Sequence, residues 1–351
     1  MSVLALARSE LLALRPYSSA RMEAGRAAVM LNANESPYAP FPVDAHGLNR
    51  YPEPQPAELL GRLAAAWGVR PPQVFLGRGS DEAIDLLVRA FCRAGEDSLL
   101  VCPPTFGMYR VAAGVQGARV VEVPLRVDAG FALDVDALLQ AEFEHPCKLV
   151  FVCAPNNPTG GDLPLSTIRD LAGALQERAL LVVDEAYVEY AGRESAASLL
   201  DAHPNLAVLR TLSKAWGLAG ARIGALLAAP EVVGLLRRIM APYPLPTPCV
   251  AAALAACEPA ATAERSARVA RTLAERARVA AALAAHPAVR ELWPSAANFL
   301  AFRVDDGRAT WLRLGERGVV VRDVGHYPGL QQCLRVSIGT PAENDAFLAA
   351  L

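Results

Sequence analysis

One lysine in this sequence stands among groups suited to binding a phosphate. Lys214 lies in the string TLSKAWGLAGAR, where an apolar run ends at Thr211. Thr211 and Ser213 offer hydroxyl groups and Arg222 offers a guanidinium, so an anion held by them would lie beside a reactive amine. A neutral lysine amine condenses with aldehydes. Taken alone, the lysine would be interpreted as a surface residue in a turn, but its neighbours favour covalent amine chemistry.

Two further motifs place polar side chains directly after apolar runs. Asp184 ends one run in VVDEAY and Tyr187 follows it, while Asn157 follows another run in APNNPTGG. Ligands of open α/β sheets bind outside the carboxyl ends of strands. There a carboxylate could bond the N–H of a protonated pyridine ring and keep it an electron sink, while the phenol and the amide contact a ring hydroxyl. The alternatives are a solvent-facing acidic strand end and a turn chosen for its backbone geometry.

A helix N-terminus is predicted in the string GRGSDEAI, where glycines precede a helix expected over 81–93. Either Ser80 or Asp81 is predicted to cap this helix. Because the first amide groups of a helix have no partner within it, they bind phosphate readily. Ordinary helix capping explains the motif equally well, so it supports a phosphate site only in combination with Ser213 and Arg222.

Two arginines near the end of the chain are candidates for binding a substrate anion. Arg322 lies in VVVRD and Arg335 lies in CLRVSIGT, both within predicted strands. A buried guanidinium requires a negatively charged partner. For Arg322 an internal ion pair with Asp323 is a realistic alternative, and it is less so for Arg335.

The elements that position these residues alternate between apolar runs and helical patterns. This rhythm predicts an α/β fold with a mostly parallel central sheet flanked by helices. Runs without polar alternation suit strands that are covered on both faces. Strands are predicted over 74–77, 98–102, 120–123, 149–153, 180–184, 206–211 and 223–228, and a helix over 164–177. A smaller α+β unit is predicted from helices over 250–285 and 308–317 and strands over 298–303, 319–322 and 333–338.

Domain boundaries are predicted from proline-rich segments. The segment APYPLPTP, over 241–248, holds four prolines and cannot be a helix interior. We therefore expect a large domain over 46–245, a small domain over 246–351 and an N-terminal arm over 1–45 that forms part of the small domain. The proline-rich segment over 35–56 carries Tyr38, Phe41 and Tyr51. Because solvent exposure of these rings is unfavourable, we expect this segment to be ordered.

The composition argues against large polyanionic partners. With 34 basic and 36 acidic residues the formal charge is −2, so no cationic field favours nucleic acid or an anionic membrane. The sequence shows neither an apolar stretch of the ~18 residues that a membrane span needs nor a secretory signal, so we expect a cytoplasmic protein with small-molecule ligands. The seven cysteines are scattered, and we expect reduced thiols and no metal site.

Taken together, these motifs resemble those of the fold-type-I aminotransferases, which bind pyridoxal 5′-phosphate. The patterns R-G-S-D-E, P-N-N-P-T-G, D-E-A-Y and S-K-x-x-x-L-A-G-x-R occur in the order seen in that superfamily, and the match covers nearly the whole chain. Within the superfamily, the strings LNANESPY, NRYPEPQP, CPPTFGMY, RTLSKAWGLAGARIG, APYPLPTP and LRVSIGT are most similar to the histidinol-phosphate aminotransferase family. The resemblance implies a large cofactor-binding domain and a smaller α+β domain.

The resemblance also implies a role for each motif residue. Lys214 would hold the cofactor as a Schiff base and act in catalysis with Asp184, the partner of the ring nitrogen, and Tyr187. Tyr187 and Asn157 would contact the ring oxygen, and Phe106 would stack on the ring, where many relatives carry tyrosine. The cofactor phosphate would be held by Ser80, the backbone amide of Asp81, Thr211, Ser213 and Arg222, with Tyr51 contributed by the other subunit of a homodimer. The substrate would be bound by Tyr17, Asn34, Arg322 and Arg335.

The reaction implied by the resemblance belongs to histidine biosynthesis. An amino group moves between L-histidinol phosphate and 2-oxoglutarate, giving imidazole-acetol phosphate and glutamate, in two half-reactions with ping-pong kinetics. Two enzymes of the same superfamily, an aromatic amino-acid aminotransferase and a threonine-phosphate decarboxylase, share the cofactor motifs and are alternatives. A cofactor-binding regulator is the non-enzymatic alternative, but it would need a separate DNA-binding domain.

Overall fold

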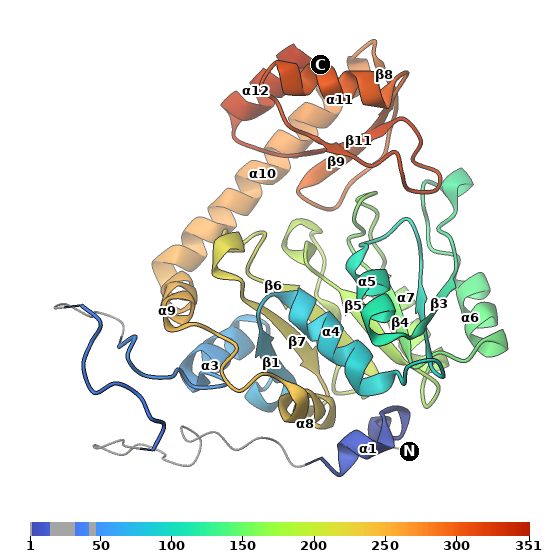
Figure 1. The fold of residues 1–351 in the computed structure, drawn as a ribbon. Coiled ribbons are helices and arrows are strands. Elements are labelled where there is room, and N and C mark those ends of the chain that lie inside the picture. Colours follow the sequence, from blue (N-terminus) through green and yellow to red (C-terminus); the bar gives the residue numbers. More distant parts are fainter. Residues whose placement is uncertain (1, 15–31, 42–46) are drawn as a thin grey trace.

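Two β-sheets organise the chain in the computed structural model, which describes residues 2–14, 32–41 and 47–351 (Figure 1). The seven-stranded sheet has the order β1-β7-β6-β5-β4-β2-β3, and the four-stranded sheet has the order β10-β11-β9-β8. The strands of the large sheet are β1 Val74–Gly77, β2 Ser98–Val101, β3 Arg119–Glu122, β4 Leu149–Cys153, β5 Leu180–Asp184, β6 Leu206–Thr211 and β7 Gly224–Ala228. Those of the small sheet are β8 Val289–Leu292, β9 Phe299–Val304, β10 Arg322–Asp323 and β11 Cys333–Ser337.

The large sheet is mostly parallel, which confirms the predicted fold class. Strands β3, β2, β4, β5 and β6 pair in parallel, and β7 runs antiparallel to both of its neighbours, β1 and β6. Every residue of β4, β5, β6 and β7 is buried, as the unbroken apolar runs predict for strands covered on both faces. Parallel pairing brings the carboxyl ends of β4, β5 and β6 to one edge of the sheet.

Helices cover both faces of the large sheet (Figure 1). Helices α4 Ser80–Phe91, α5 Met108–Gln116 and α8 Pro230–Ile239 pack on one face, and α3 Ala57–Ala66, α6 Val135–Glu144 and α7 Leu165–Ala174 pack on the other. Along β4, Leu149 and Phe151 pack in the hydrophobic core on the side of α4, α5 and α8, and Val150 and Val152 pack in the core on the side of α3, α6 and α7. Among the described residues, the other α-helices are α1 Ser9–Leu12, α9 Thr247–Ala256, α10 Pro259–Ala285, α11 Gly307–Glu316 and α12 Pro341–Ala350.

Helix α4 differs from its prediction at the N-terminus. The N-cap is Gly79, with φ 79°, and Ser80 is already the first helical residue, so neither Ser80 nor Asp81 caps the helix. A glycine suits this place because few other residues adopt a positive φ. The helix begins against β7, where a Cβ atom at Gly224 would lie 2.2 Å from the amide nitrogen of Ser80. Glycine at position 224 is therefore required for the N-terminus of α4 to reach the sheet.

Two other elements differ from their predictions because of local chain geometry. The helix predicted over 250–285 is two helices, α9 and α10, since Glu258 is extended and Pro259 opens the second one. The strand predicted over 319–322 is shorter, with only Arg322 and Asp323 in β10. No described helix, not even the 27-residue α10, is both long and apolar enough to cross a bilayer. The predicted domain boundaries near residues 45 and 245 stay predictions.

The proline-rich segment over 35–56 is held by a buried carboxylate. Glu35 accepts hydrogen bonds from the Arg50 side chain at 2.8 Å and from the Tyr51 amide at 2.7 Å. The aromatic side chains of this segment are exposed, however, with exposed fractions of 80% for Tyr38 and 61% for Phe41. The expectation that these two rings are buried is wrong for a single chain.

Replacing Gly224 by alanine tests the contact between β7 and α4. The added methyl group collides with backbone, which cannot rotate away as a side chain can, so we expect Gly224→Ala to lower the free energy of unfolding by roughly 1–3 kcal/mol. Gly234, inside α8, has no atom within 4 Å of its Cβ position. The control Gly234→Ala should raise stability by roughly 0.5–1 kcal/mol. Chemical denaturation measures both, and equal stability of the two variants would contradict the collision.

Candidate active site

A cavity of about 290 Å³ lies at the carboxyl ends of β4, β5 and β6, beside the N-terminus of α4. It collects most of the residues that the motifs predicted, although they come from six separate parts of the chain. The predicted residues that line it are Ser80, Asp81, Phe106, Asn157, Asp184, Tyr187, Thr211, Ser213, Lys214, Arg222 and Arg335. The structure thus brings the lysine, the carboxylate and the anion-binding groups into one site.

Lys214 stands in this cavity with its amine close to aromatic and cationic groups. Its Nζ atom lies 5.6 Å from the ring centroid of Tyr187. Burial lowers the pKa of Lys214, and the positive charge of Arg335 lowers it further, against the opposing effect of Asp184. A lower pKa increases the fraction of neutral amine, which is the nucleophilic form.

Asp184 lies at the end of β5 and is 2% exposed. Its Oδ1 accepts a hydrogen bond from the Ala186 amide at 3.1 Å, and its Oδ2 accepts one from the Tyr109 hydroxyl at 2.7 Å. Burial raises the pKa of Asp184 to about 6, and these hydrogen bonds oppose the rise. Both donors are neutral, so the carboxylate has no full counter-charge at contact distance among the described residues.

The neighbouring carboxylate, Glu185, shows how this chain satisfies a buried charge. Glu185 is fully buried, but its Oε1 pairs with the Arg193 guanidinium at 2.8 Å and accepts from the Ala196 amide at 2.8 Å, while Ser195 donates to Oε2. Asp184 faces the cavity without such a partner. The difference indicates that a cationic or N–H-donating ligand group belongs beside Asp184.

An anion site forms where α4 begins. The guanidinium of Arg222 lies against Gly79, since a Cβ atom there would be 2.8 Å from Nη2, and it pairs with the Asp81 carboxylate at 2.9 Å. The first amides of α4 open on the same cavity, and the Thr211 hydroxyl accepts from the Ser213 amide at 3.1 Å. A helix N-terminus beside an arginine suits a phosphate group.

Arg335 reaches the cavity from β11 of the small sheet. Its Nη1 donates to the Asn157 side-chain oxygen, its guanidinium carbon lies 5.0 Å from the ring centroid of Phe299, and its Nε has no hydrogen-bond partner among the described residues. Burial lowers the pKa of Arg335. A buried guanidinium with a spare donor is suited to binding an anion. Since Asn157 accepts this bond through its oxygen, its N–H₂ group is the part that could donate to a ring oxygen.

The other predicted residues do not line this cavity. Arg322 is exposed on β10, and Arg335 is its opposite residue in the strand register of β10 and β11. Asp323 accepts a hydrogen bond from the Gly325 amide. Tyr51 is 48% exposed and stacks on Tyr243, with ring centroids 4.4 Å apart. Asn34 is exposed and has φ 55°. Tyr17 lies outside the described residues.

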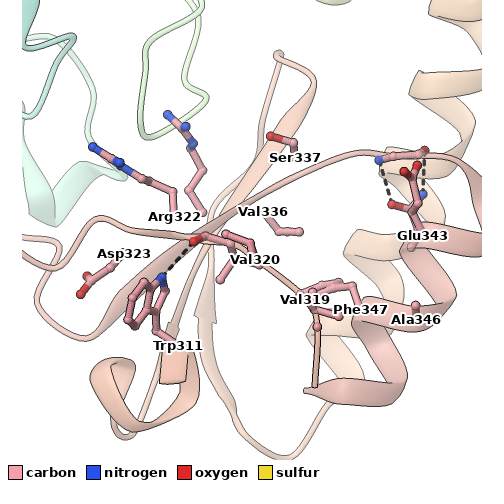
Figure 2. Close-up of a pocket in the computed structure, with 15 residues that line it drawn as sticks. Trp311, Val319, Val320, Arg322, Asp323, Val336, Ser337, Glu343, Ala346 and Phe347 are labelled. Carbon is pink, nitrogen blue, oxygen red and sulfur yellow. Dashed lines mark hydrogen bonds between the residues drawn. The ribbon is translucent and has the colours of Figure 1, made fainter. Parts of the chain in front are cut away.

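A larger cavity, of about 740 Å³, lies on the small sheet (Figure 2). It is lined by aliphatic residues such as Val319 and Val320, and Trp311 donates from its indole to the Val321 carbonyl at 3.0 Å. Figure 2 shows the side chain of Arg322 directed away from the apolar lining. None of the described residues that line this larger cavity is a lysine, histidine or cysteine. The smaller cavity is therefore the better candidate for catalysis.

Comparison with known proteins identifies the family. The family of class I and II aminotransferases matches residues 26–351. This chain belongs to that family. The histidinol-phosphate aminotransferase of Stenotrophomonas maltophilia is 56% identical over 351 residues, 99% of this chain and 96% of that protein. The one of Xanthomonas campestris pv. campestris is 50% identical over 352 residues, 100% of this chain and 97% of that protein.

A solved structure extends the comparison to the fold of this aminotransferase. The crystal structure of histidinol-phosphate aminotransferase from Sinorhizobium meliloti, in complex with pyridoxal 5′-phosphate, has a TM-score of 0.78 and 31% sequence identity. The match covers 88% of this chain and 83% of that one. The resemblance inferred from the motifs is therefore confirmed, and so is the fold-type-I class.

Replacing Asp184 by asparagine tests whether the Asp184 carboxylate is buried without a counter-charge at contact distance. The folded-state pKa of Asp184, about 6, lies above its usual value of 3.8. Between these two values the unfolded chain loses the Asp184 proton more readily than the folded chain, so the free energy of unfolding falls as the pH rises from about 4 to about 6. We expect the free energy of unfolding of cofactor-free Asp184→Asn, relative to wild type, to increase by about 2 kcal/mol between pH 4 and pH 7. Urea denaturation at each pH measures this difference. A difference independent of pH would show that Asp184 is not perturbed.

Proposed function

We propose that this protein is a histidinol-phosphate aminotransferase that carries pyridoxal 5′-phosphate on Lys214. The observation that supports the proposal most strongly is the single cavity in which Lys214 stands between the buried Asp184 carboxylate and the anion site at Arg222. These groups fit the aldehyde, the ring nitrogen and the phosphate of the cofactor. The substrate assignment is supported by the full-length similarity to histidinol-phosphate aminotransferases.

Pyridoxal 5′-phosphate supplies an aldehyde that condenses with amines and a protonated ring that delocalises the electrons released at Cα. Lys214 would provide the amine that holds the aldehyde, and the same amine would serve as the base and the acid for the proton at the substrate Cα. Asp184 holds a proton on the ring nitrogen. Tyr187 and the Asn157 amide contact the ring oxygen, and Phe106 packs on the ring. The groups for the cofactor phosphate are Ser80, the amide of Asp81, Thr211, Ser213 and Arg222.

We propose that the substrate anion binds at the junction of the two sheets. Arg335 is the principal donor, with its unpaired Nε and its position beside Lys214 and Asn157. Arg322, opposite it on β10, is close enough in the strand pair to contribute a second positive charge when an anion is bound. The phosphate of histidinol phosphate and the carboxylates of glutamate and 2-oxoglutarate would use this pair in turn, and Tyr17 and Asn34 are assigned to the same end of the substrate.

We also propose that the active enzyme is a cytoplasmic homodimer. Tyr38, Phe41 and Tyr51 are exposed on the single chain, and a second subunit would cover such apolar surface. Tyr51 is placed away from the cofactor cavity of its own chain, which agrees with a role at the cofactor phosphate of the partner subunit.

Replacing Lys214 tests the covalent role. In Lys214→Ala the cofactor can bind only by contacts, so we expect the absorbance band of the lysine-bound cofactor to be lost and turnover to fall by at least about 10³-fold. The control is Lys148→Ala, since Lys148 lies before β4, at the opposite end of that strand from the cavity. A band that persists in Lys214→Ala would contradict the assignment.

The substrate assignment is tested by comparing specificity constants. With 2-oxoglutarate as acceptor, kcat/KM for histidinol phosphate as amino donor should exceed kcat/KM for phenylalanine and for tyrosine. If an aromatic amino acid were preferred, the chain would be an aromatic amino-acid aminotransferase, and release of CO₂ from threonine phosphate would indicate the decarboxylase. Cofactor binding without turnover of any of these would favour a regulator.

Hybrid dimers test whether Tyr51 acts on the partner subunit. We mix inactive Lys214→Ala with Tyr51→Ala, which we expect to lose cofactor affinity about ten-fold or more. If Tyr51 crosses the interface, each mixed dimer contains one site with Lys214 and Tyr51 both intact, so activity at low cofactor concentration should recover toward half of the wild-type value per dimer. If Tyr51 served its own subunit, every site of the mixture would keep one defect and no recovery would occur.

A further inference from the structure

Tyr109 is a buried phenol next to the candidate active site that the motif analysis did not single out. It lies in the first turn of α5, three residues after Phe106, and its exposed fraction is 0%. Its hydroxyl donates to Oδ2 of Asp184 at 2.7 Å. It is thus the one described side chain that forms a hydrogen bond to the carboxylate proposed to hold the cofactor nitrogen.

The ring of Tyr109 is fixed by packing on two sides. It stacks on Phe151 of β4, with centroids 4.7 Å apart and planes inclined by 15°, and it meets Phe106 edge to face at 5.7 Å and 84°. Close-packed aromatic rings of this kind have little freedom to rotate. The hydroxyl therefore has a defined position, and so does the carboxylate oxygen that accepts from it.

The two hydrogen bonds to Asp184 come from different elements and engage different oxygens. Tyr109, on α5, donates to Oδ2, and the Ala186 amide, after β5, donates to Oδ1. Each carboxylate oxygen can accept about two hydrogen bonds, so one site on each remains for a ligand. Two donors of fixed position determine the plane of the carboxylate, and that plane decides where a ring nitrogen can approach.

We propose that Tyr109 is a positioning residue, which orients the Asp184 carboxylate toward the nitrogen of the cofactor ring. Through its contact with Phe106, it would also fix the plane of the Phe106 ring, on which the cofactor ring would stack. The proposal rests on the proposed function, because it assumes a ring in the cavity. One turn of α5 would then place both the stacking group and, indirectly, the group that holds the nitrogen.

The hydroxyl also bears on the charge of Asp184. The titratable groups that interact with this carboxylate are Tyr109 from α5, Cys153 from β4, Asp81 from α4, Tyr187 after β5 and Lys214 after β6. Burial raises the pKa of Asp184, whereas the bond from Tyr109 lowers it, as does the charge of Lys214. Loss of the hydroxyl would favour the protonated acid, and a neutral acid cannot stabilise a protonated ring nitrogen.

The substitution Tyr109→Phe tests the proposal because it removes one oxygen and keeps the ring that packs on Phe151 and Phe106. The matched control is Tyr190→Phe, which removes the hydroxyl of another buried tyrosine, located in the short helix Val188–Tyr190. Unfolding of both cofactor-free variants is measured first to establish that they fold. The readouts that follow are the pKa of Asp184, cofactor affinity and steady-state kinetics.

In cofactor-free protein labelled with ¹³C at the aspartate carboxyl carbons, the Asp184 signal is assigned by its loss in Asp184→Asn. We expect the pKa of Asp184, about 6 in the wild type, to be higher by about one in Tyr109→Phe and unchanged in Tyr190→Phe. Titration of the cofactor-free variants with pyridoxal 5′-phosphate should show about ten-fold weaker binding for Tyr109→Phe alone.

In the loaded enzyme, kcat of Tyr109→Phe should fall while KM for the amino donor stays near its wild-type value, since Tyr109 does not face the substrate anion site. Unchanged values of the Asp184 pKa, the cofactor affinity and kcat would overturn the proposal while leaving the proposed function intact. Failure of the wild-type protein to bind pyridoxal 5′-phosphate would instead overturn the proposed function, and the carboxyl titration would still report on the bond between Tyr109 and Asp184.

Discussion

A carboxylate that is buried without a counter-charge at contact distance is the constraint around which this structure is arranged. Asp184 is held at the end of β5 by two neutral donors, and its ionised form is costly in such a place. The parallel sheet places the carboxylate at a strand end, where a cationic or N–H-donating ligand group can form a hydrogen bond to it and offset this cost. The adjacent Glu185, which has an arginine of its own, shows that the chain could have neutralised this position and did not.

Close backbone packing fixes the position of the anion site at the start of α4 relative to the large sheet, which carries this carboxylate. Gly224 allows β7 to touch the start of α4, and Gly79 allows Arg222 to lie against the helix N-terminus. The anion site is therefore set by the backbone of the sheet and not by flexible side chains alone. Lys214, after β6, lines the same cavity, and the charges of both Asp184 and Arg222 act on its amine.

The sequence was sufficient to predict the parts of this site that follow from strand ends. Lys214, Asp184 and Asn157 each come directly after an apolar run, and parallel pairing necessarily brings such residues together. Tyr109 was not predicted because its importance depends on how α5 packs against β4, which no local pattern encodes. The break between α9 and α10 was overlooked although Pro259 marks it. The exposure of Tyr38 and Phe41 could not be predicted, because the aromatic content of a segment does not determine whether the folded chain covers it.

The bond between Arg335 and Asn157 joins residues that are 178 positions apart. A ribosome synthesises the large sheet, from β1 to β7, well before Arg335 leaves the exit tunnel, and domains generally fold as they emerge. The part of the cavity that contains Lys214 and Asp184 is consequently made while the part that contains Arg335 has not yet been synthesised. An unfinished chain would therefore contain the groups proposed to bind the cofactor before it contains Arg335, the group proposed to bind the substrate anion, so the two proposed functions would arise at different times during translation.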